Sequence, residues 1–366
     1  MKVIIQLIRF FVGVLFIFSG LIKANDPMGL SYKMQEFFEI WGLHFLNDYT
    51  LVLSICMIGF EIIAGIALLV GWQIRLFSWL LFLLIVFFTF LTGYAVLSGK
   101  IKECGCFGDC IKLTANQSFY KDLLLLALSS ILLWKKDMIQ PLFKDRVSRL
   151  ILILSTVFSF GIQFYVLAYL PIIDCLPYKK GVSIPENMKI PAGAIPDSTV
   201  INFVYTKNGA EVEFDAEHFP ADFNDSLYQF VKRYDKVVRE GNAKPPIKDF
   251  VILSSTGADT TQAILSDPQE RYILFAKTME GDAGDWIEDF KSLIQSKGSQ
   301  MPIIAVTSDA DNLTTLFAKA QINIPIMKGD LVAIKTAART NPTLYKIKAG
   351  VILDKYGKKQ IAKAIE

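Results

Sequence analysis

The chain has 366 residues, of which 52% are hydrophobic and 20% are charged, and its formal net charge is +3. This composition indicates a membrane-embedded part joined to a soluble part. Nucleic-acid binding has no support, because the basic residues cluster where membrane topology explains them. The two histidines, His44 and His218, and the lack of a phosphate-binding glycine loop argue against hydrolytic and multi-histidine metal chemistry.

Three segments of the first half are apolar enough to cross a membrane. Residues 76–99 and 150–173 carry no charge, and Glu61 is the one charged residue within residues 49–74. At about 1.5 Å per residue, each segment is long enough for the ~30 Å hydrocarbon layer. We therefore predict a membrane span in each.

Two further spans are predicted from less uniform segments. Residues 3–22 contain Arg9 near one end, where a long side chain can snorkel, and they lack a signal-peptide cleavage site, so they are expected to remain as a first helix. The fourth span is expected to begin near Ser118, because the purely apolar run after Lys121 and Asp122 is too short to cross alone. Together these segments predict five spans.

Basic residues predict the orientation of the spans. The N-terminus, the loop containing Arg75 and the link over residues 135–149 are basic, which predicts that they lie on the cytoplasmic side of the membrane. Residues 24–48, residues 99–117 and everything after Asp174 would then face the periplasm. In the first of these loops, apolar residues recur at helical spacing, which predicts an amphipathic helix along the membrane surface.

Three of the five cysteines, Cys104, Cys106 and Cys110, lie in one short outer loop, and Cys175 follows the fifth span. These four thiols face an oxidising compartment and allow three complete pairings, whereas Cys56 is expected to be buried within the second span. A strained, labile Cys104–Cys106 disulfide could pass electrons to a membrane quinone. A permanent disulfide that braces the loop is the alternative, and a zinc site is a poor match to the Cys-x-Cys spacing.

Glu61 is a carboxylate deep in a predicted span, where an unpaired charge is expensive. We expect it to pair with Lys23, Arg9 or Arg75, and to act either as a proton carrier or as a hydrogen-bonding group that fixes two helices. Lys121 and Asp122 are adjacent, so their side chains should point to different helix faces, with at least one of them bracing the cysteine loop.

The composition changes after the fifth span. Prolines and glycines over residues 175–198 indicate an extended linker, and an Asn208-Gly209 turn signal predicts a β-hairpin at the start of the next segment. Alternating strands and helices from residue 262 onward predict an α/β domain with a central sheet. The predicted organisation is a membrane domain, a cytoplasmic link with the fifth span, a linker, a β-rich outer segment and an α/β domain, over residues 1–134, 135–174, 175–198, 199–261 and 262–366.

The α/β domain resembles a thioredoxin fold, in which a cis-proline turn precedes a strand. Residues 341–352, beginning Asn341-Pro342, are similar to that turn and the strands that follow it. A thioredoxin carries Cys-x-x-Cys opposite this proline, but the corresponding residues 276–286 contain no cysteine. The resemblance therefore implies that the Pro342 face binds a partner rather than exchanging disulfides.

The membrane part resembles the DoxX and MauE families of small four-helix membrane proteins. The motifs that carry this resemblance lie in and after the first span, in the second span and in the cysteine loop: Arg9, Gly13, Phe16, Ser19, Gly20, Lys23, Asp26, Pro27, Glu61, Gly65, Gly71, Arg75, Cys104–Asp109, Lys121 and Asp122. A fifth helix with an outer thioredoxin-like domain resembles architectures of Bacteroidetes-type bacteria. Relatives are linked to thiosulfate and quinone oxidation, to disulfide formation in methylamine dehydrogenase and, loosely, to vitamin K epoxide reductase.

The predicted fold is thus a membrane helical bundle of four DoxX-like spans and a fifth span, followed by a soluble thioredoxin-like domain. The first functional hypothesis is a membrane thiol-disulfide oxidoreductase linked to a membrane quinone, without a metal, acting on periplasmic protein thiols. Its expected catalytic residues are Cys104, Cys106, Cys110 and Glu61, and its expected partner-binding residues are Pro342, Asp109, Lys121 and Asp122. The alternative is a non-catalytic scaffold in the lipid bilayer that presents the outer domain to envelope proteins.

Overall fold

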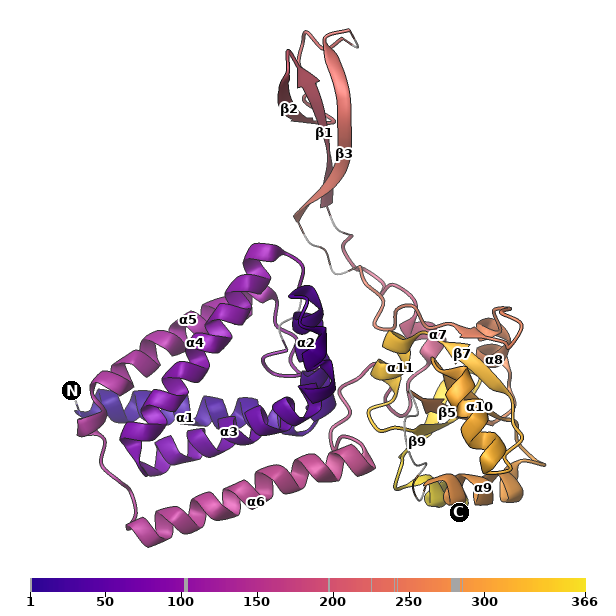
Figure 1. Ribbon diagram of the computed structural model, residues 1–366, viewed down its shortest axis with the longest axis horizontal. Helices are drawn as coiled ribbons and strands as arrows, with labels where there is room; N and C mark the ends of the chain where they lie inside the picture. Colours follow the sequence, from indigo (N-terminus) through magenta and orange to yellow (C-terminus); the bar gives the residue numbers. More distant parts are fainter. Residues whose placement is uncertain are drawn as a thin grey trace.

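The computed structural model describes the chain except for residues 1, 102–104, 197, 225, 240, 242, 278–283 and 285. Its first half is helical (Figure 1), and the helices are α1 (Lys2–Ala24), α2 (Pro27–Ile40), α3 (Thr50–Val70), α4 (Ile74–Ser98), α5 (Ala115–Trp134) and α6 (Asp145–Tyr169). A 3-10 turn over His44–Tyr49 leads into α3, and a second over Lys136–Met138 follows α5.

Four helical stretches of the described chain are long and apolar enough to cross a membrane, namely Lys2–Ala24, His44–Val70, Ile74–Ser98 and Asp145–Tyr169. They correspond to the first, second, third and fifth predicted spans. The predicted fourth span, α5, does not meet the same criterion of length and hydropathy, because its first half is polar. It nevertheless packs along α4 and also contacts α1.

The bundle is held together by close packing at small residues. Helix α3 packs against α1 on one side and α6 on another, and α4 packs against α5. A Cβ atom added at Gly65 in α3 would lie 2.9 Å from the carbonyl oxygen of Gly13 in α1. This contact brings the two backbones together without intervening side chains, as small residues allow in membrane helices.

The C-terminal domain has a six-stranded mixed sheet in the order β4-β7-β6-β5-β8-β9. Strand β5 pairs in parallel with β6, and β6 with β7, whereas β8 and β9 continue the sheet in antiparallel fashion. The strands are β4 (Ile252–Leu253), β5 (Arg271–Ala276), β6 (Ile303–Thr307), β7 (Ile326–Gly329), β8 (Thr343–Lys348) and β9 (Val351–Gly357).

Helices cover both faces of this sheet because side chains alternate along its buried strands. Ile273 of β5 belongs to a core shared with α8 (Thr261–Ser266) and α11 (Leu331–Ala337). Its neighbour Leu274 belongs to the opposite core, shared with α9 (Trp286–Lys297) and α10 (Ala310–Lys319). A 3-10 turn over Ile361–Ala364 closes the chain against this second core.

The segment expected to be an extended linker instead forms part of this domain. Tyr178 and Ile184 are buried in the α8/α11 core, and the amide of Ile184 donates to the carbonyl of Gly350. The short helix α7 (Ile184–Asn187) lies in this segment. The prolines that suggested a linker therefore lie within a packed segment. The large apolar residues between them supply its core contacts.

A separate three-stranded antiparallel sheet, in the order β2-β1-β3, stands away from both the bundle and the C-terminal domain (Figure 1). Its strands are β1 (Ser198–Lys207), β2 (Ala210–Asp215) and β3 (Tyr228–Arg239). The turn between β1 and β2 uses Asn208 and Gly209, both at positive φ, which confirms the predicted hairpin.

Candidate functional site

The cysteine loop turns sharply at two glycines before it enters α5. Gly105 and Gly108 have φ angles of +67° and +57°, and the Gly108 amide donates to the Gly105 carbonyl at 3.0 Å. A side chain at either position would be strained in this left-handed region. The turn directs Cys106 into the helical bundle and leaves Cys110 exposed at the end of the loop.

Beneath Cys106 lies a buried ion pair between α1 and α3. The Lys23 Nζ atom is 2.5 Å from Glu61 Oε1, and the two side chains are 3% and 1% exposed. Ser19 Oγ lies 3.2 Å from Glu61 Oε2 and 3.1 Å from the carbonyl oxygen of Cys106. Of the three cations proposed as partners of Glu61, the structure selects Lys23, and Ser19 connects this carboxylate to the loop.

A second ion pair borders the same region from α5. Lys121 Nζ is 2.7 Å from Asp122 Oδ1, and Thr92 of α4 donates to the other carboxylate oxygen at 3.1 Å. The Lys121 ammonium also lies 5.1 Å from the ring centroid of Phe107 in the cysteine loop. Adjacent residues of a helix were expected to point to different faces. These two side chains nevertheless meet, because the long lysine chain reaches back to its neighbour.

Cys106 borders two spaces. A small cavity of about 20 Å³ is lined by Cys106, both ion pairs and apolar residues of α1, α4 and α5. A groove of about 60 Å³ runs between α2 and α4 and is lined mainly by aromatic and aliphatic side chains, with Cys106 and Lys23 at one end. We call the first space the bundle-mouth cavity and the second the α2/α4 groove.

Burial raises the pKa of the Cys106 thiol, while the nearby Lys121 ammonium acts in the opposite direction. The thiol is therefore held protonated until a base or a change in its surroundings removes the proton. Cys106 is free in the structure. Cys56 is also free, but its side chain is exposed on the surface of α3 rather than buried, which corrects the prediction.

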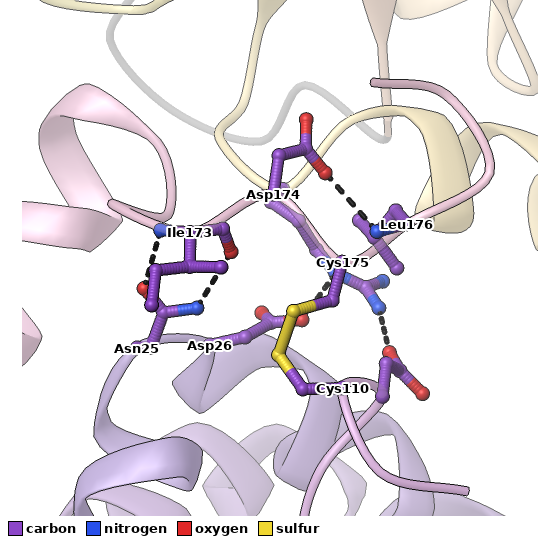
Figure 2. Close-up of a disulfide and its surroundings, with 9 residues drawn as sticks. Asn25, Asp26, Cys110, Ile173, Asp174, Cys175 and Leu176 are labelled. Atoms are coloured by element: carbon purple, nitrogen blue, oxygen red, sulfur yellow. Dashed lines mark hydrogen bonds and ion pairs between the residues drawn. A yellow bond between two sulfur atoms is a disulfide. The ribbon is translucent and has the colours of Figure 1, made fainter. Parts of the chain in front are cut away.

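Cys110 forms a disulfide with Cys175, which lies just after α6 (Figure 2). The bond joins residues 65 positions apart and therefore fixes the cysteine loop to the beginning of the C-terminal half. Beside it, Asn25 makes two hydrogen bonds with the backbone of Ile173, at 2.8 and 3.0 Å (Figure 2). The Cys110–Cys175 bond belongs to one of the three complete pairings that the sequence allowed, and it links the cysteine loop to the C-terminal half.

Arg339 completes this junction from the end of α11. Its Nε atom donates to Asp26 Oδ2 at 2.8 Å, and its Nη2 atom donates to Asp109 of the cysteine loop. The guanidinium is 5% exposed. Burial acts to lower the pKa of Arg339, but the two carboxylates outweigh it and raise that pKa; burial raises the pKa of Asp26, with Arg339 opposing. The three residues form a buried, mutually dependent cluster.

Three cations surround the ring of Tyr32 in α2. The charged groups of Lys277, Lys335 and Arg339 lie 5.3, 5.2 and 5.5 Å from its centroid. Each distance is within the range of a cation–π interaction. Burial, followed by the charge of Arg339, lowers the pKa of Lys277 to about 7. The junction thus combines aromatic and ionic contacts between the membrane part and the C-terminal domain.

An open cleft of about 490 Å³ lies beside the junction, between α2 and α11. Cys175 forms part of its wall, together with the charged side chains Lys33, Glu36, Glu39, Asp109, Lys112, Lys335 and Arg339. We call this space the junction cleft. It lies next to the disulfide, whereas the bundle-mouth cavity lies beneath Cys106.

Comparison with known proteins covers the first third of the chain and one further segment. Residues 1–135 match the family model of the methylamine utilisation protein MauE. Residues 199–240, which contain the β2-β1-β3 sheet, match a domain of unknown function, DUF8463. No curated protein matches the chain. The MauE match includes Cys106, Cys110, both buried ion pairs and α2.

The expected site residues fall into separate parts of the structure. Glu61, Cys106, Lys121 and Asp122 border the bundle-mouth cavity, whereas Asp109 contributes to the junction. Cys104 lies outside the described residues. Pro342 follows a cis peptide bond and is buried, and the nearby Arg339 makes contacts at the junction.

Sequence reasoning missed Arg339, Lys277 and Tyr32. Each is an ordinary residue in its local sequence, and the contacts join segments up to 313 positions apart. A usable signal existed for Arg339, because it lies two residues before the Asn341-Pro342 motif that had already been singled out.

Proposed function

We propose that this chain is a membrane thiol-disulfide oxidoreductase whose membrane-side thiol is Cys106. The observation that carries the proposal is the position of this free thiol, which shares the bundle-mouth cavity with Glu61 and also opens to the apolar α2/α4 groove. Buried charge pairs are costly in a membrane. A thiol that served only for packing would not need such pairs in the cavity that it borders.

The proposed reaction partner of Cys106 is Cys104, two positions earlier. Oxidation of the two thiols to a disulfide releases two electrons and two protons. Cys106 starts as a thiol because burial raises its pKa, and Glu61 is the proposed carrier of its proton. Ser19 links Glu61 to the cysteine loop and so holds the carboxylate near this thiol.

The α2/α4 groove suits a lipophilic ring compound such as a membrane quinone. Its lining includes Phe37, Trp41, Phe87 and Phe88, and a cation, Lys23, lies at the end next to Cys106. Such pockets, largely apolar with a few polar groups, are typical of small-molecule sites. A quinone bound there would supply the acceptor for two electrons and two protons.

For the C-terminal domain we propose a thioredoxin-like fold. Support comes from the parallel β5–β6 pair, the antiparallel β8–β9 pair and the cis Asn341–Pro342 peptide bond that precedes β8. Because Arg339 and Lys277 contact the membrane part, this face serves as a cap on the cysteine loop. A likeness of the bundle to DoxX proteins remains a prediction.

The proposed location is a bacterial inner membrane, with the N-terminus in the cytoplasm and the C-terminal domain in the periplasm. The Cys110–Cys175 bond supports α5 as the fourth of the five predicted spans, because it holds the start of α5 and the end of α6 together. If α6 crosses the membrane, the chain between these cysteines must cross once more, and α5 is the helix available within it.

The test is a redox titration of the purified full-length chain, with alkylation and peptide mapping of every cysteine, in the presence and absence of a soluble quinone analogue. Cys106 should become oxidised when the quinone is added, and Cys106→Ser should abolish quinol production. The matched control is Cys56→Ser, which removes a thiol on the outer surface of α3 and should leave the rate unchanged. Quinol production by Cys106→Ser at the wild-type rate would refute the proposal.

A second candidate function is a non-catalytic scaffold for envelope proteins. The observation in its favour is the β2-β1-β3 sheet, which stands apart from the rest of the chain and exposes apolar side chains, including Phe230 and Val238. The titration separates the two functions, because a scaffold requires no response of Cys106 to quinone.

A further inference from the structure

The Cys110–Cys175 disulfide differs from Cys106 in what surrounds it. Cys110 is exposed, and Cys175 forms part of the wall of the junction cleft. Cys106 instead points to the membrane side of the same loop. Only three residues of one loop therefore lie between a half-buried thiol and an accessible disulfide, and the two sulfur sites face different spaces of the molecule.

From this arrangement we propose that the junction cleft is a docking site for an extended peptide segment carrying a thiol, which exchanges with the Cys110–Cys175 disulfide. The inference deepens the proposed oxidoreductase function by naming its outer substrate class, a protein dithiol, and the site that receives it. Cys175 lies outside the MauE-matching residues 1–135, so this site belongs to the particular architecture of this chain.

The walls of the cleft favour a peptide over a lipophilic molecule. Lys33 pairs with Glu36 at 3.0 Å, Lys335 donates to Gln35 at 3.0 Å, and Glu39 adds a negative charge. An ammonium group has three donors and a carboxylate has several acceptor positions, so these side chains retain capacity for the donors and acceptors of a peptide backbone. The cleft has about eight times the volume of the α2/α4 groove, and a larger share of its lining is polar. An open cleft with charged side chains on its walls, beside a disulfide, suits a chain segment that must present one sulfur atom.

The exchange step is balanced as follows. A thiolate of the peptide attacks Cys175 Sγ, a new sulfur–sulfur bond forms, and the bond to Cys110 breaks with Cys110 leaving as a thiolate. The second peptide thiolate then attacks the mixed disulfide, which gives an oxidised peptide and a Cys175 thiolate. Lys112 lines the cleft two residues after Cys110, where its charge favours the leaving thiolate.

Cys175 is the sulfur proposed for attack because it lines the cleft, whereas Cys110 is the end held by the cysteine loop. The two electrons then reside on Cys110 and Cys175, next to the loop that carries Cys106. Their onward transfer belongs to the proposed function and is not needed for the exchange itself.

The test uses the oxidised full-length protein in detergent and a synthetic peptide with two cysteines, without any quinone. Val332 is an exposed residue of α11 in the cleft wall, so Val332→Trp should fill the cleft without touching the disulfide. Reduction of the disulfide by the peptide should slow by about tenfold, whereas reduction by dithiothreitol, which needs no docking, should keep its rate. The matched control, Val238→Trp on β3, places the same exposed substitution outside the cleft and should change neither rate.

A second variant identifies the attacked sulfur. Cys110→Ser leaves Cys175 as a free thiol, which should form a stable mixed disulfide with a peptide whose cysteine is activated as a disulfide with thionitrobenzoate, releasing thionitrobenzoate. Cys175→Ser should form that adduct more slowly. Failure of the peptide to reduce the disulfide, an equal loss of both reduction rates in Val332→Trp, or faster adduct formation by Cys175→Ser would overturn the inference.

The proposed function and this inference fail separately. Oxidation of Cys106 by quinone with no peptide exchange at Cys110–Cys175 would refute the docking site alone. Peptide exchange with no response of Cys106 to quinone would support the docking site. It would refute the proposed electron transfer from Cys106 to a membrane quinone.

Discussion

Replacement of Arg339 by leucine should open the junction between the membrane part and the C-terminal domain. The guanidinium is 5% exposed and serves both Asp26 and Asp109. Removing one partner of a buried ion pair costs about 3–5 kcal/mol, because the remaining charge stays desolvated. We expect the lower end, ~3 kcal/mol, since Asp26 also accepts a hydrogen bond from the Gly29 amide and Asp109 is 26% exposed.

At about 1.4 kcal/mol per factor of ten, this loss corresponds to roughly a hundredfold larger open population. Hydrogen exchange of the backbone amides of α2 and α11 measures that population directly. The matched control is Arg75→Leu, which breaks an exposed pair with Asp137 and should leave these amides unchanged. The defect of Arg339→Leu should also shrink as the pH falls, because protonation of Asp26 removes the uncompensated charge.

A rescue variant tests the reasoning more strictly. Adding Asp26→Asn and Asp109→Asn to Arg339→Leu removes the stranded charges, so most of the lost protection should return. Unchanged exchange in Arg339→Leu would show that the cluster does not hold the junction. Equal exchange in the single and triple variants would show that its contribution is not electrostatic.

Three further outcomes are expected. Lys277 is protonated up to about 7 in the folded chain but to about 10.5 when unfolded, so stability should rise between these pH values, and Lys277→Met should abolish the rise and stabilise the chain at pH 7 in thermal unfolding. Lys23→Met or Glu61→Gln alone should lower the yield of folded protein in detergent by size-exclusion chromatography, whereas Lys23→Met with Glu61→Met should restore yield but not quinol production. Gly65→Leu should lower the thermal unfolding temperature, because its Cβ atom would lie 2.9 Å from the Gly13 carbonyl oxygen, and Gly65→Ala should lower it less.

Hydropathy alone located four helical stretches of the bundle, because long uncharged runs have few alternatives to a membrane helix. It did not reveal which side of a helix faces lipid. Cys56 was expected to be buried, yet an apolar helix carries no periodic signal that separates a protein-facing side from a lipid-facing side. For the same reason the partner of Glu61 remained one of three until the packing of α1 against α3 placed Lys23 beside it.

Long-range contacts explain what sequence reasoning left open in the soluble part. The Arg339–Asp109 ion pair joins residues 230 positions apart, and no local pattern at either residue indicates the other. Tyr178 and Ile184 were assigned to a linker because prolines surround them, although their burial depends on a sheet formed much later in the chain. The hairpin turn between β1 and β2 was predicted correctly, because the Asn208-Gly209 signal is entirely local.

The Cys110–Cys175 bond also constrains how the chain is made. Cys110 is synthesised 65 residues before Cys175, and α5 and α6 lie between them. If α5 and α6 both span the membrane, as proposed above, the two sulfurs meet on one side only after both helices have been inserted in opposite directions. Formation of this bond during biosynthesis would therefore report that the second half of the bundle has reached its final topology, and a chain with α6 inverted would be left with two separated thiols that quality-control systems can recognise.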